Sequence, residues 1–243
     1  SSVVNTTSGT GDVGNSGDGG PAISALLSSP TDLAFAADGT YYVVDHYNNR
    51  IRRVSPNGVI NGFAGDGTDF CEANLPCGDG GPAVNAKIAS PTSVAVAHDG
   101  SVFVSDTNRN RIRKVGLDGV ITTVAGTGAE CDPMAACGDG GPAASAQLNQ
   151  PRYIHIAQDG SLYIADSGSN RVRKVGTNGN ISTVAGSGNV NCPNDNVPTR
   201  QACIDAPTAV ALTANGELYI TAGDGRQQSR IFRLGTDGLL KVV

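Results

Sequence analysis

The chain has 243 residues, of which 39% are hydrophobic and 16% charged, so it can bury roughly 70–75% of its unfolded surface and is not expected to be disordered. Its net charge is −5 and its 17 lysines and arginines are scattered, which excludes a basic stripe for nucleic acid. No apolar run approaches the roughly 20 residues of a membrane-spanning helix, so no membrane insertion of this segment is expected.

The first predicted element is a strand over residues 2–8. The chain begins SSVVNTTSG, without an initiator methionine or a signal-type segment, which indicates either a processed chain or a piece of a longer one. SVVNTTSGTG aligns with VITTVAGTG at 120–128, the end of a later repeat, so residues 2–8 are predicted to be an additional outer strand. Asn5 in this segment, like Asn180 further on, lies in an N-x-S/T triplet and is a candidate glycosylation site.

Four similar segments follow, each beginning at a proline. In each, alternating apolar residues and Asp-Gly or Asn-Gly turns predict four short strands, as in VAVA, SVFVSD, RIRKVG and VITTVAG of the second. Four-stranded antiparallel units in tandem indicate an all-β fold, a β-propeller in which neighbouring blades stack to bury their faces. The predicted blades, within a single domain over 1–243, span residues 30–66, 91–126, 151–186 and 207–243.

The six cysteines fall into three local pairs, which lie in the connections between blades. No histidine is interleaved and the C-x-x-C spacing of zinc sites is missing, so disulfides are the favoured interpretation. Persistent disulfides indicate an oxidising compartment, and hence an extracellular location, secreted or on the cell surface. The predicted pairs are Cys71 with Cys77, Cys131 with Cys137, and Cys192 with Cys203.

The motif GDGGPA precedes the first three blades and places an aspartate in each connection: Asp18, Asp79 and Asp139. One interpretation is a Ca²⁺ site, because hard cations prefer carboxylate and carbonyl oxygens. The other is a tight turn whose aspartate caps a short helix in PAVNAKI or PAASAQL. A calcium loop offers several acidic groups at alternating positions and each of these offers one, which favours the turn.

The segments AHDGSVFVSDTNRNRIRKVGLDGVITTVAGTG and AQDGSLYIADSGSNRVRKVGTNGNISTVAGSG resemble the NHL repeat, and this resemblance covers residues 17–243. The cysteine pair followed by CGDGGPA is similar to the NHL propeller of teneurins and of bacterial teneurin-like proteins with Rhs/YD repeats. The resemblance implies a propeller that usually has six blades, whereas four repeats are present. The fourth is irregular, because NVPTRQACIDA before it lacks GDGGPA and Ala222 replaces the motif aspartate.

The last blade already contains its own outer strand, so the additional N-terminal strand leaves two unpaired edges. Either the chain is part of a larger propeller array, or neighbouring chains complete one another by strand addition.

A charged pair recurs around the loop between the second and third strands. An aspartate ends the second strand and an arginine begins the third, and a carboxylate there is expected to accept backbone hydrogen bonds and pair with the arginine. Repetition in nearly every blade favours a structural role over catalysis. The residues are Asp45, Arg50, Asp106, Arg111, Asp166, Arg171 and, in the blade without the aspartate, Arg230.

Signals of catalysis are weak in this sequence. It has no G-x-S-x-G elbow, P-loop or cysteine–histidine couple, and its histidines, His46, His98 and His155, occupy three different registers. His155, with Arg152 and Tyr153, is the one candidate for a channel metal of the kind that propeller lyases and lactonases use. The chain is expected to be no enzyme and to need no cofactor, with a metal-dependent lyase or lactonase as an alternative.

The function expected is an extracellular scaffold that binds a protein or glycan partner. Its binding rim would carry the cysteine loops, the GDGGPA segments and the D-x-x-x-N-R loops, because loops on a rigid frame are where recognition usually resides. The positions freest to vary lie between paired cysteines, at 72–76 and 132–136. A second hypothesis is the repeating subunit of a surface fibre, which self-associates through terminal strands.

Overall fold

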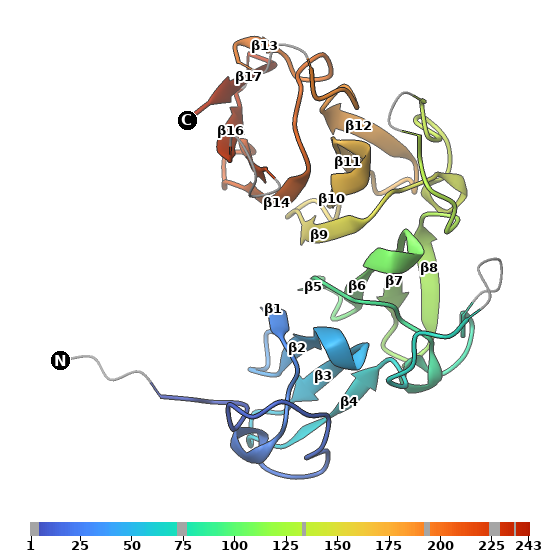
Figure 1. Ribbon diagram of the computed structural model, residues 1–243, viewed down its shortest axis with the longest axis vertical. Helices are drawn as coiled ribbons and strands as arrows, with labels where there is room; N and C mark the ends of the chain where they lie inside the picture. The colour runs from blue at the N-terminus through green and yellow to red at the C-terminus, as the bar shows by residue number, and fades with distance from the viewer. Residues whose placement is uncertain (1–4, 72–76, 133–134, 192–194, 224–228, 236) are drawn as a thin grey trace. The chain divides into compact units, whose positions relative to one another are not determined.

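The computed structural model describes residues 5–71, 77–132, 135–191, 195–223, 229–235 and 237–243. Within these ranges the chain forms four antiparallel sheets, each built on four consecutive strands that pair in sequence order and are joined by turns and one-turn 3₁₀ helices (Figure 1). The all-β prediction with four blades is confirmed. No helix in the described ranges has the length and apolar character needed to cross a membrane.

Each blade consists of four consecutive strands. Blade 1 contains β1 (Pro30–Phe35), β2 (Tyr41–Asp45), β3 (Arg50–Val54) and β4 (Ile60–Ala64). Blade 2 contains β5 (Val94–Val96), β6 (Val102–Asp106), β7 (Arg111–Val115) and β8 (Ile121–Ala125). Blade 3 contains β9 (Pro151–Ile156), β10 (Leu162–Asp166), β11 (Arg171–Val175) and β12 (Ile181–Ala185). Blade 4 contains β14 (Pro207–Leu212), β15 (Leu218–Ala222), β16 (Arg230–Leu234) and β17 (Leu239–Val242), with the short β13 (Val197–Pro198) at its edge.

In the described part of the chain, six 3₁₀ helices of three residues each lie in the connections. Three precede blades 1 to 3: η1 (Ala22–Ser24), η3 (Ala83–Asn85) and η5 (Ala143–Ser145). Three join the second and third strands: η2 (His46–Asn48), η4 (Thr107–Arg109) and η6 (Ser167–Ser169).

The chain divides into two compact units, one of residues 1–104 with 114–122 and one of residues 105–113 with 123–243. In the first unit, Val44 and Ile51 of blade 1 share a buried cluster with Ile88, Val94 and Val104 of blade 2 and its connection. Burying one such side chain contributes about 1.5–3 kcal/mol, so this face-to-face packing is a main source of stability. We call the side bearing Val44 and Ile51 the rear face of a blade, and the side bearing Val94 the front face.

The second unit repeats this arrangement between blades 3 and 4. Ala165 and Val172 on the rear face of blade 3 share a cluster with Ile204, Val210 and Ile220 of blade 4 and its connection. The same pair of faces therefore meets in both units.

The connection before each blade covers the outer edge of that blade. Gly19 N donates to Ile60 O (2.8 Å) and Ile60 N donates to Gly20 O (3.0 Å), so GDGG runs antiparallel to β4. The equivalent bridges in blades 2 and 3 join Pro82 to Val120 and Pro142 to Asn180. GDGGPA is thus an edge-covering segment as well as a turn, which the sequence analysis did not predict.

Blade 4 keeps this edge cover despite its irregular connection. β13 pairs with β17, and Asn196 N donates to Leu240 O (2.8 Å). Asp195 precedes Pro207 by the same number of residues as Asp79 precedes Pro91, so DNVP is a degenerate form of DGGP. The outer edge expected to be unpaired in the last blade is therefore partly paired within the chain.

The strand predicted over residues 2–8 is wrong where the structure describes it, because residues 5–8 belong to no strand; residues 2–4 lie outside the described ranges. The next residues nevertheless follow the repeat. Gly9 N donates to Ala22 O (2.9 Å), as Gly65 N donates to Ala83 O (2.9 Å) where the chain leaves blade 1. The segment before blade 1 thus makes the same backbone hydrogen bond as the segment that follows the outer strand of blade 1.

The D-x-x-x-N-R loop depends on its asparagine. Asn49 ends η2 in the left-handed conformation (φ 52°), which asparagine tolerates better than most residues. Its Oδ1 accepts a hydrogen bond from Ser90 N (2.8 Å), directly before blade 2. Asn110 and Asn170 repeat both features, accepting from Gln150 N and Ala206 N. One residue therefore closes the loop and ties it to the connection that leads to the next blade.

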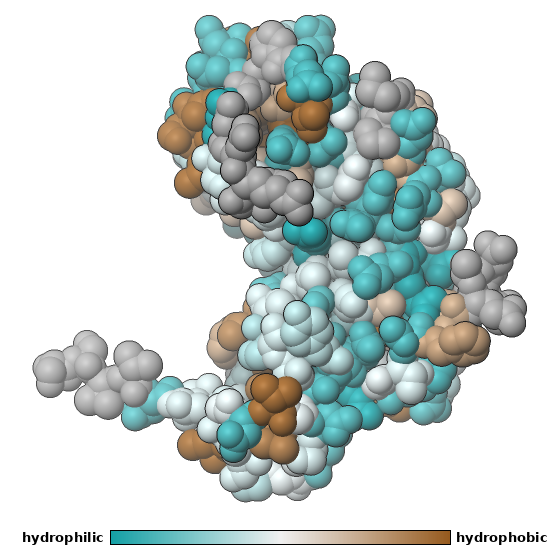
Figure 2. Space-filling view, viewed as in Figure 1, coloured by the Kyte–Doolittle hydropathy of each residue, from teal (hydrophilic) through white to brown (hydrophobic). Residues whose placement is uncertain are grey.

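Most of the surface in Figure 2 is hydrophilic or neutral, with small, separate apolar areas. The exposed large apolar residues include Leu33, Phe35, Leu117, Ile231 and Val243.

Candidate functional site

The repeated aspartate lies at the centre of a buried polar cluster. Asp45 is fully buried and accepts hydrogen bonds from Ser28 N (2.7 Å) and Asn48 Nδ2 (2.8 Å). Its ion-pair partner is Arg52, whose Nη1 lies 3.4 Å from Asp45 Oδ2. The carboxylate thus joins the second strand, the following loop and the incoming connection, and its role is structural.

The expected pairing of Asp45 with Arg50 is corrected by this geometry. The two residues are opposite each other in the β2–β3 register, but the ion pair is made by the arginine two positions later. Arg113 with Asp106 (3.2 Å) and Arg173 with Asp166 (3.6 Å) repeat the pair. All three of these arginines are fully buried, although the sequence analysis did not single them out.

The arginines that begin the third strands of blades 1 to 3 instead donate hydrogen bonds to backbone carbonyls just after the outer strand ends. Arg50 Nη2 donates to Asp66 O (3.1 Å), just beyond the end of β4. Arg111 donates to Thr127 O (2.8 Å) and Arg171 to Ser187 O (3.3 Å) in the same way. Arg230 begins β16 in blade 4. In blades 1 to 3 these arginines hold the chain where it leaves the blade.

Asp18 and Asp139 of the GDGGPA segments form ion pairs, and the expected helix cap is wrong. The residue before η1 is Pro21, and no side chain caps this helix. Asp18 Oδ1 lies 2.7 Å from Arg52 Nη2, so the buried guanidinium is held between two carboxylates. Asp139 lies 2.8 Å from Arg173 in the same way and also 3.0 Å from Arg200. This arrangement supports the turn interpretation over a cation site, because the carboxylates already face guanidinium groups.

Blade 4 replaces both members of the buried pair at once. Ala222 stands at the position of the aspartate, and Phe232 stands at that of the buried arginine. Their exposed fractions are 6% and 2%, and both belong to the core of the second unit. An apolar pair thus fills the space of an ion pair, a replacement that is often neutral or stabilising. This joint change is the sequence signal that could have identified the buried arginines.

The motif aspartates of blades 1 and 3 differ in the hydrogen bonds that their carboxylates accept. Burial raises the pKa of Asp166 to about 6, even though Asn149 N and Arg173 oppose that shift. Asp166 Oδ2 has no hydrogen bond within the described ranges, whereas both oxygens of Asp45 accept from Asn48. The pKa of the weakly compensated Asp166 carboxyl is therefore raised toward neutral pH.

Replacing Asp166 with asparagine should remove a pH dependence of stability. A carboxyl whose pKa is higher in the folded chain binds its proton more tightly there than in the unfolded chain. Its contribution to the free energy of unfolding is therefore greatest below the unfolded pKa and is lost as pH rises through about 6. Urea unfolding of wild type and Asp166→Asn at pH 4 to 7 should show the wild type losing on the order of 2–3 kcal/mol relative to the variant.

Asp159→Asn provides a control of opposite sign. Hydrogen bonds from Ser161 lower the pKa of Asp159. The contribution of this carboxylate to stability is therefore present above the unfolded pKa and is lost as pH falls through the folded pKa. A wild-type profile that parallels Asp166→Asn over the whole range would contradict the shift.

Two of the predicted disulfides lie in the described ranges, Cys71–Cys77 and Cys131–Cys137. The third involves Cys192, which lies outside them, while Cys203 is buried beside blade 4. The Cys131–Cys137 loop is attached to blade 3: Arg171 Nη1 lies 3.6 Å from Cys131 Sγ, and Asn149 Nδ2 donates to Cys131 O (3.3 Å). Cysteine loop, GDGGPA segment and D-x-x-x-N-R loop therefore meet around this blade.

The variable positions between the cysteines are only partly described. Residues 72–76 and 133–134 lie outside the described ranges, while Asp132, Ala135 and Ala136 are exposed. The candidate glycosylation residues Asn5 and Asn180 are also exposed, and their modification remains a prediction.

The three histidines lie at separate positions and form no common site. His46 Nδ1 donates to Pro91 O (2.8 Å), a position where Thr107 and Ser167 donate to Pro151 O and Pro207 O in later blades. His155 is half-buried in β9, and burial lowers its pKa. Neither His155 nor His98 belongs to a group of three potential metal ligands within the described ranges.

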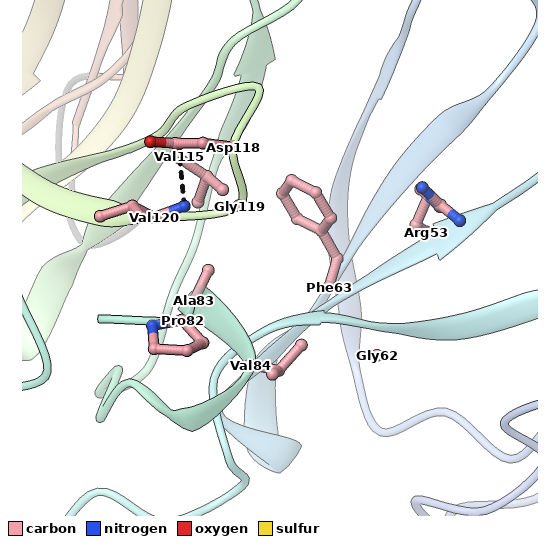
Figure 3. A pocket seen from close by; sticks show the side chains of 10 residues that line it. All are labelled: Arg53, Gly62, Phe63, Pro82, Ala83, Val84, Val115, Asp118, Gly119 and Val120. Atoms are coloured by element: carbon pink, nitrogen blue, oxygen red, sulfur yellow. Dashed lines mark hydrogen bonds between the residues drawn. The ribbon is translucent and has the colours of Figure 1, made fainter. Parts of the chain in front are cut away.

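The first unit contains a pocket of about 380 Å³. Phe63, on β4, stands in it, with Val84 and Pro82 on one side and Val115 and Gly119 on the other (Figure 3). Arg53 and Asp118 are the charged lining residues, and Asp118 Oδ1 accepts from Val120 N (3.1 Å). The mostly apolar lining is suited to contact with an apolar or aromatic group.

Comparisons with known proteins support the repeat assignment. The Teneurin NHL domain model matches residues 68–127 and 122–197, and the NHL repeat model matches residues 27–54. Teneurin-3 of Mus musculus is 37% identical over 163 residues, covering 63% of this chain and 6% of that protein. Teneurin-3 of Danio rerio is 29% identical over 247 residues, covering 93% and 9%. The chain thus spans less than a tenth of these relatives.

Solved structures with the same fold have low sequence identity. Virginiamycin B lyase from Staphylococcus aureus matches with a TM-score of 0.54 and 15% identity, covering 88% of this chain and 55% of that one. An auxiliary nutrient binding protein from Bacteroides thetaiotaomicron matches with a TM-score of 0.59 and 14% identity, covering 84% and 48%. These similarities establish a β-propeller fold and nothing about activity. Because the family model matches more than half of its length, the chain belongs to the teneurin NHL domain family.

Proposed function

We propose that this chain is a non-catalytic domain of a larger cell-surface or secreted protein, and that it binds a protein or glycan partner through its cysteine loops. The supporting observation is that the repeated charged residues lie within the scaffold, whereas the described residues between the cysteines of the second loop are exposed. Arg52 contacts both Asp45 and Asp18, whereas Ala135 and Ala136 are exposed in a disulfide-closed loop attached to blade 3. Disulfides and membership of the teneurin family support the extracellular location.

The loop is suited to recognition because its frame is rigid. The buried disulfide and Arg171 fix both ends of a short loop, so little conformational entropy is lost when a partner binds. Its residues differ from those of the first cysteine loop, while the surrounding motif is the same. Variation confined to a fixed frame is expected where each loop contacts a partner differently.

Ala136→Arg should weaken binding by tenfold or more, because it adds bulk and charge at the proposed contact. The probes are a printed glycan panel and a panel of purified extracellular domains, each tested against fluorescently labelled chain. Ala214→Arg is the matched control, since Ala214 is exposed in the turn between β14 and β15, and it should leave binding within about twofold.

Equal loss in both variants, or binding to no member of either panel, would refute the proposed site. Circular dichroism and free-thiol titration of each variant show whether the fold and disulfides are intact.

A further inference from the structure

The pocket between blades 1 and 2 is lined by an arginine that the scaffold does not use. Arg53 is exposed and makes no hydrogen bond or ion pair with any residue in the described ranges. The equivalent residues of blades 2 and 3 are lysines that do form ion pairs. Lys114 Nζ lies 3.6 Å from Asp99 Oδ2, within the same blade. Lys174 Nζ lies 3.7 Å from Asp159 Oδ2 in the same way. The guanidinium of blade 1 is therefore available to a ligand.

An aromatic side chain beside Arg53 replaces the contact that the lysines make. In blade 3, Lys174 Nζ lies 5.2 Å from the centroid of the Tyr163 ring, across the β10–β11 register. Tyr42 is opposite Arg53 in the same manner, but its ring packs against Phe63 instead, with the two centroids 4.6 Å apart. Valine stands at the position of Phe63 in blades 2 and 3. Blade 1 thus combines an added aromatic ring with a cation that no carboxylate holds.

The rest of the pocket is mostly apolar and comes from blade 2 and its connection. Figure 3 shows Phe63 between Arg53 and these lining residues. Val84, in the lining, is 47% exposed, and Leu117, which directly precedes the lining residue Asp118, is 82% exposed. Apolar surface therefore continues beyond the pocket. This continuation favours a peptide with flanking residues over an isolated small molecule.

Asp118, the other charged lining residue, is explained by its turn. Its Oδ1 accepts a hydrogen bond from Val120 N (3.1 Å). Residues at the same turn position in the other blades accept the equivalent hydrogen bond: Asn57, Asn178 and Asp237. The charge that has no role in the scaffold is therefore the positive one. Its complement is a carboxylate, which a guanidinium binds through two parallel hydrogen bonds.

We propose that this pocket binds a peptide segment of a partner protein. The segment inserts an aromatic side chain beside Phe63 and places a neighbouring carboxylate on Arg53. The pocket volume of about 380 Å³ accommodates one large side chain. An aromatic anchor in a pocket, next to a charged contact, is typical of the few residues that dominate binding energy in protein interfaces. The proposal is independent of the partner proposed for the cysteine loops.

Further blades of the same fold would not occupy this site. An added blade stacks on a free blade face, whereas this pocket lies between the rear face of blade 1 and the front face of blade 2. Those two faces already pack together through Val44, Ile51 and Val94. All the lining residues belong to the first unit, so the site is complete within it.

Fluorescence anisotropy with fluorescein-labelled hexapeptides measures the proposed binding. The probe Ser-Gly-Phe-Asp-Gly-Ser should bind with a Kd between about 10 µM and about 1 mM. Replacing its aspartate with lysine should weaken binding about tenfold, because attraction to Arg53 becomes repulsion. Replacing its phenylalanine with alanine should weaken binding tenfold or more, because the buried ring is lost.

A charge reversal in the chain is the decisive measurement. Arg53→Glu should reverse the preference, so that the lysine peptide binds about tenfold more tightly than the aspartate peptide. Lys174→Glu is the matched control, because it makes the same change at the equivalent position of blade 3. It should leave both affinities within about twofold. Circular dichroism of each variant shows whether the fold is intact.

The double variant Arg53→Lys/Phe63→Val gives blade 1 the residues that blades 2 and 3 have at these positions. It should weaken binding of the aspartate peptide tenfold or more while the chain stays folded. Binding of none of the peptides would overturn the proposal, and so would binding of the aspartate peptide that Arg53→Glu leaves unchanged.

Two other occupants of the pocket are distinguished by the same variants. Light scattering at the same concentrations detects a second copy, and self-association that Arg53→Lys/Phe63→Val abolishes would exclude a separate partner. The titration is also repeated with the larger protein proposed above. If residues 1–243 bind the aspartate peptide and the larger protein does not, a segment of that protein fills the pocket, and the proposed partner is wrong.

Discussion

Replacing Arg52 with methionine should destabilise the first unit by about 3–5 kcal/mol, because it leaves the buried Asp45 carboxylate without its cationic partner. Asp18 also loses a contact, but its side chain is 40% exposed and remains hydrated. The large effect comes from the uncompensated buried charge rather than from any net strength of the ion pair. Urea unfolding followed by far-ultraviolet circular dichroism measures the loss.

The double variant Asp45→Ala/Arg52→Phe should recover most of that loss. It copies Ala222 and Phe232, which fill the same two positions in blade 4. Removing both charges removes the desolvation penalty, and the ring fills the volume of the guanidinium. Arg53→Met, at an exposed position of the same strand, should change stability by less than about 0.5 kcal/mol. A double variant no more stable than Arg52→Met would show that the pair contributes in a way that blade 4 does not reproduce.

The strands of each blade are the part of the fold that local sequence predicts well. In SVFVSD, a short apolar run of β-branched and aromatic residues follows an Asp-Gly turn, and β6 occupies Val102–Asp106. Short apolar runs and turn chemistry act over a few residues, so they can be recognised without knowledge of tertiary contacts.

The ion-pair partner required tertiary information. Arg50 and Arg52 lie on the same side of β3, and the backbone register places Arg50 opposite Asp45. Diagonal neighbours are also within reach of long side chains, and the guanidinium of Arg52 is the one directed into the buried cluster. Two arginines of equal charge cannot be distinguished by spacing alone.

The edge-covering role of GDGGPA was missed for a different reason. The segment pairs with the outer strand through a few backbone hydrogen bonds about 40 residues along the chain, such as Gly19 N to Ile60 O. Backbone pairing of this kind imposes no side-chain pattern, and glycine-rich text is typical of turns. The repeat itself could have suggested the role, since a motif kept before three blades is expected to make the same contact in each.

Gly126→Ala should destabilise the second unit by about 4 kcal/mol or more, an effect reserved for severe backbone conflicts. Gly126 follows β8 with φ +90°, and a Cβ there would lie 2.1 Å from Asn110 O. That carbonyl belongs to the left-handed asparagine that closes the D-x-x-x-N-R loop, so it cannot move without opening the loop. The first glycine of the GxG that follows the outer strands of blades 1 to 3 is thus explained by close backbone approach rather than by flexibility.

Gly119→Ala separates this clash from backbone strain. Gly119 has a similar φ of +77°, but a Cβ there meets nothing within 4 Å, so the change should cost only about 1–2 kcal/mol. Urea unfolding of both variants gives the difference. If Gly126→Ala does not fold, a lower soluble yield and faster proteolysis than those of Gly119→Ala would show this. Similar losses would contradict the argument, because φ strain would then be the whole effect and the contact with Asn110 would contribute nothing.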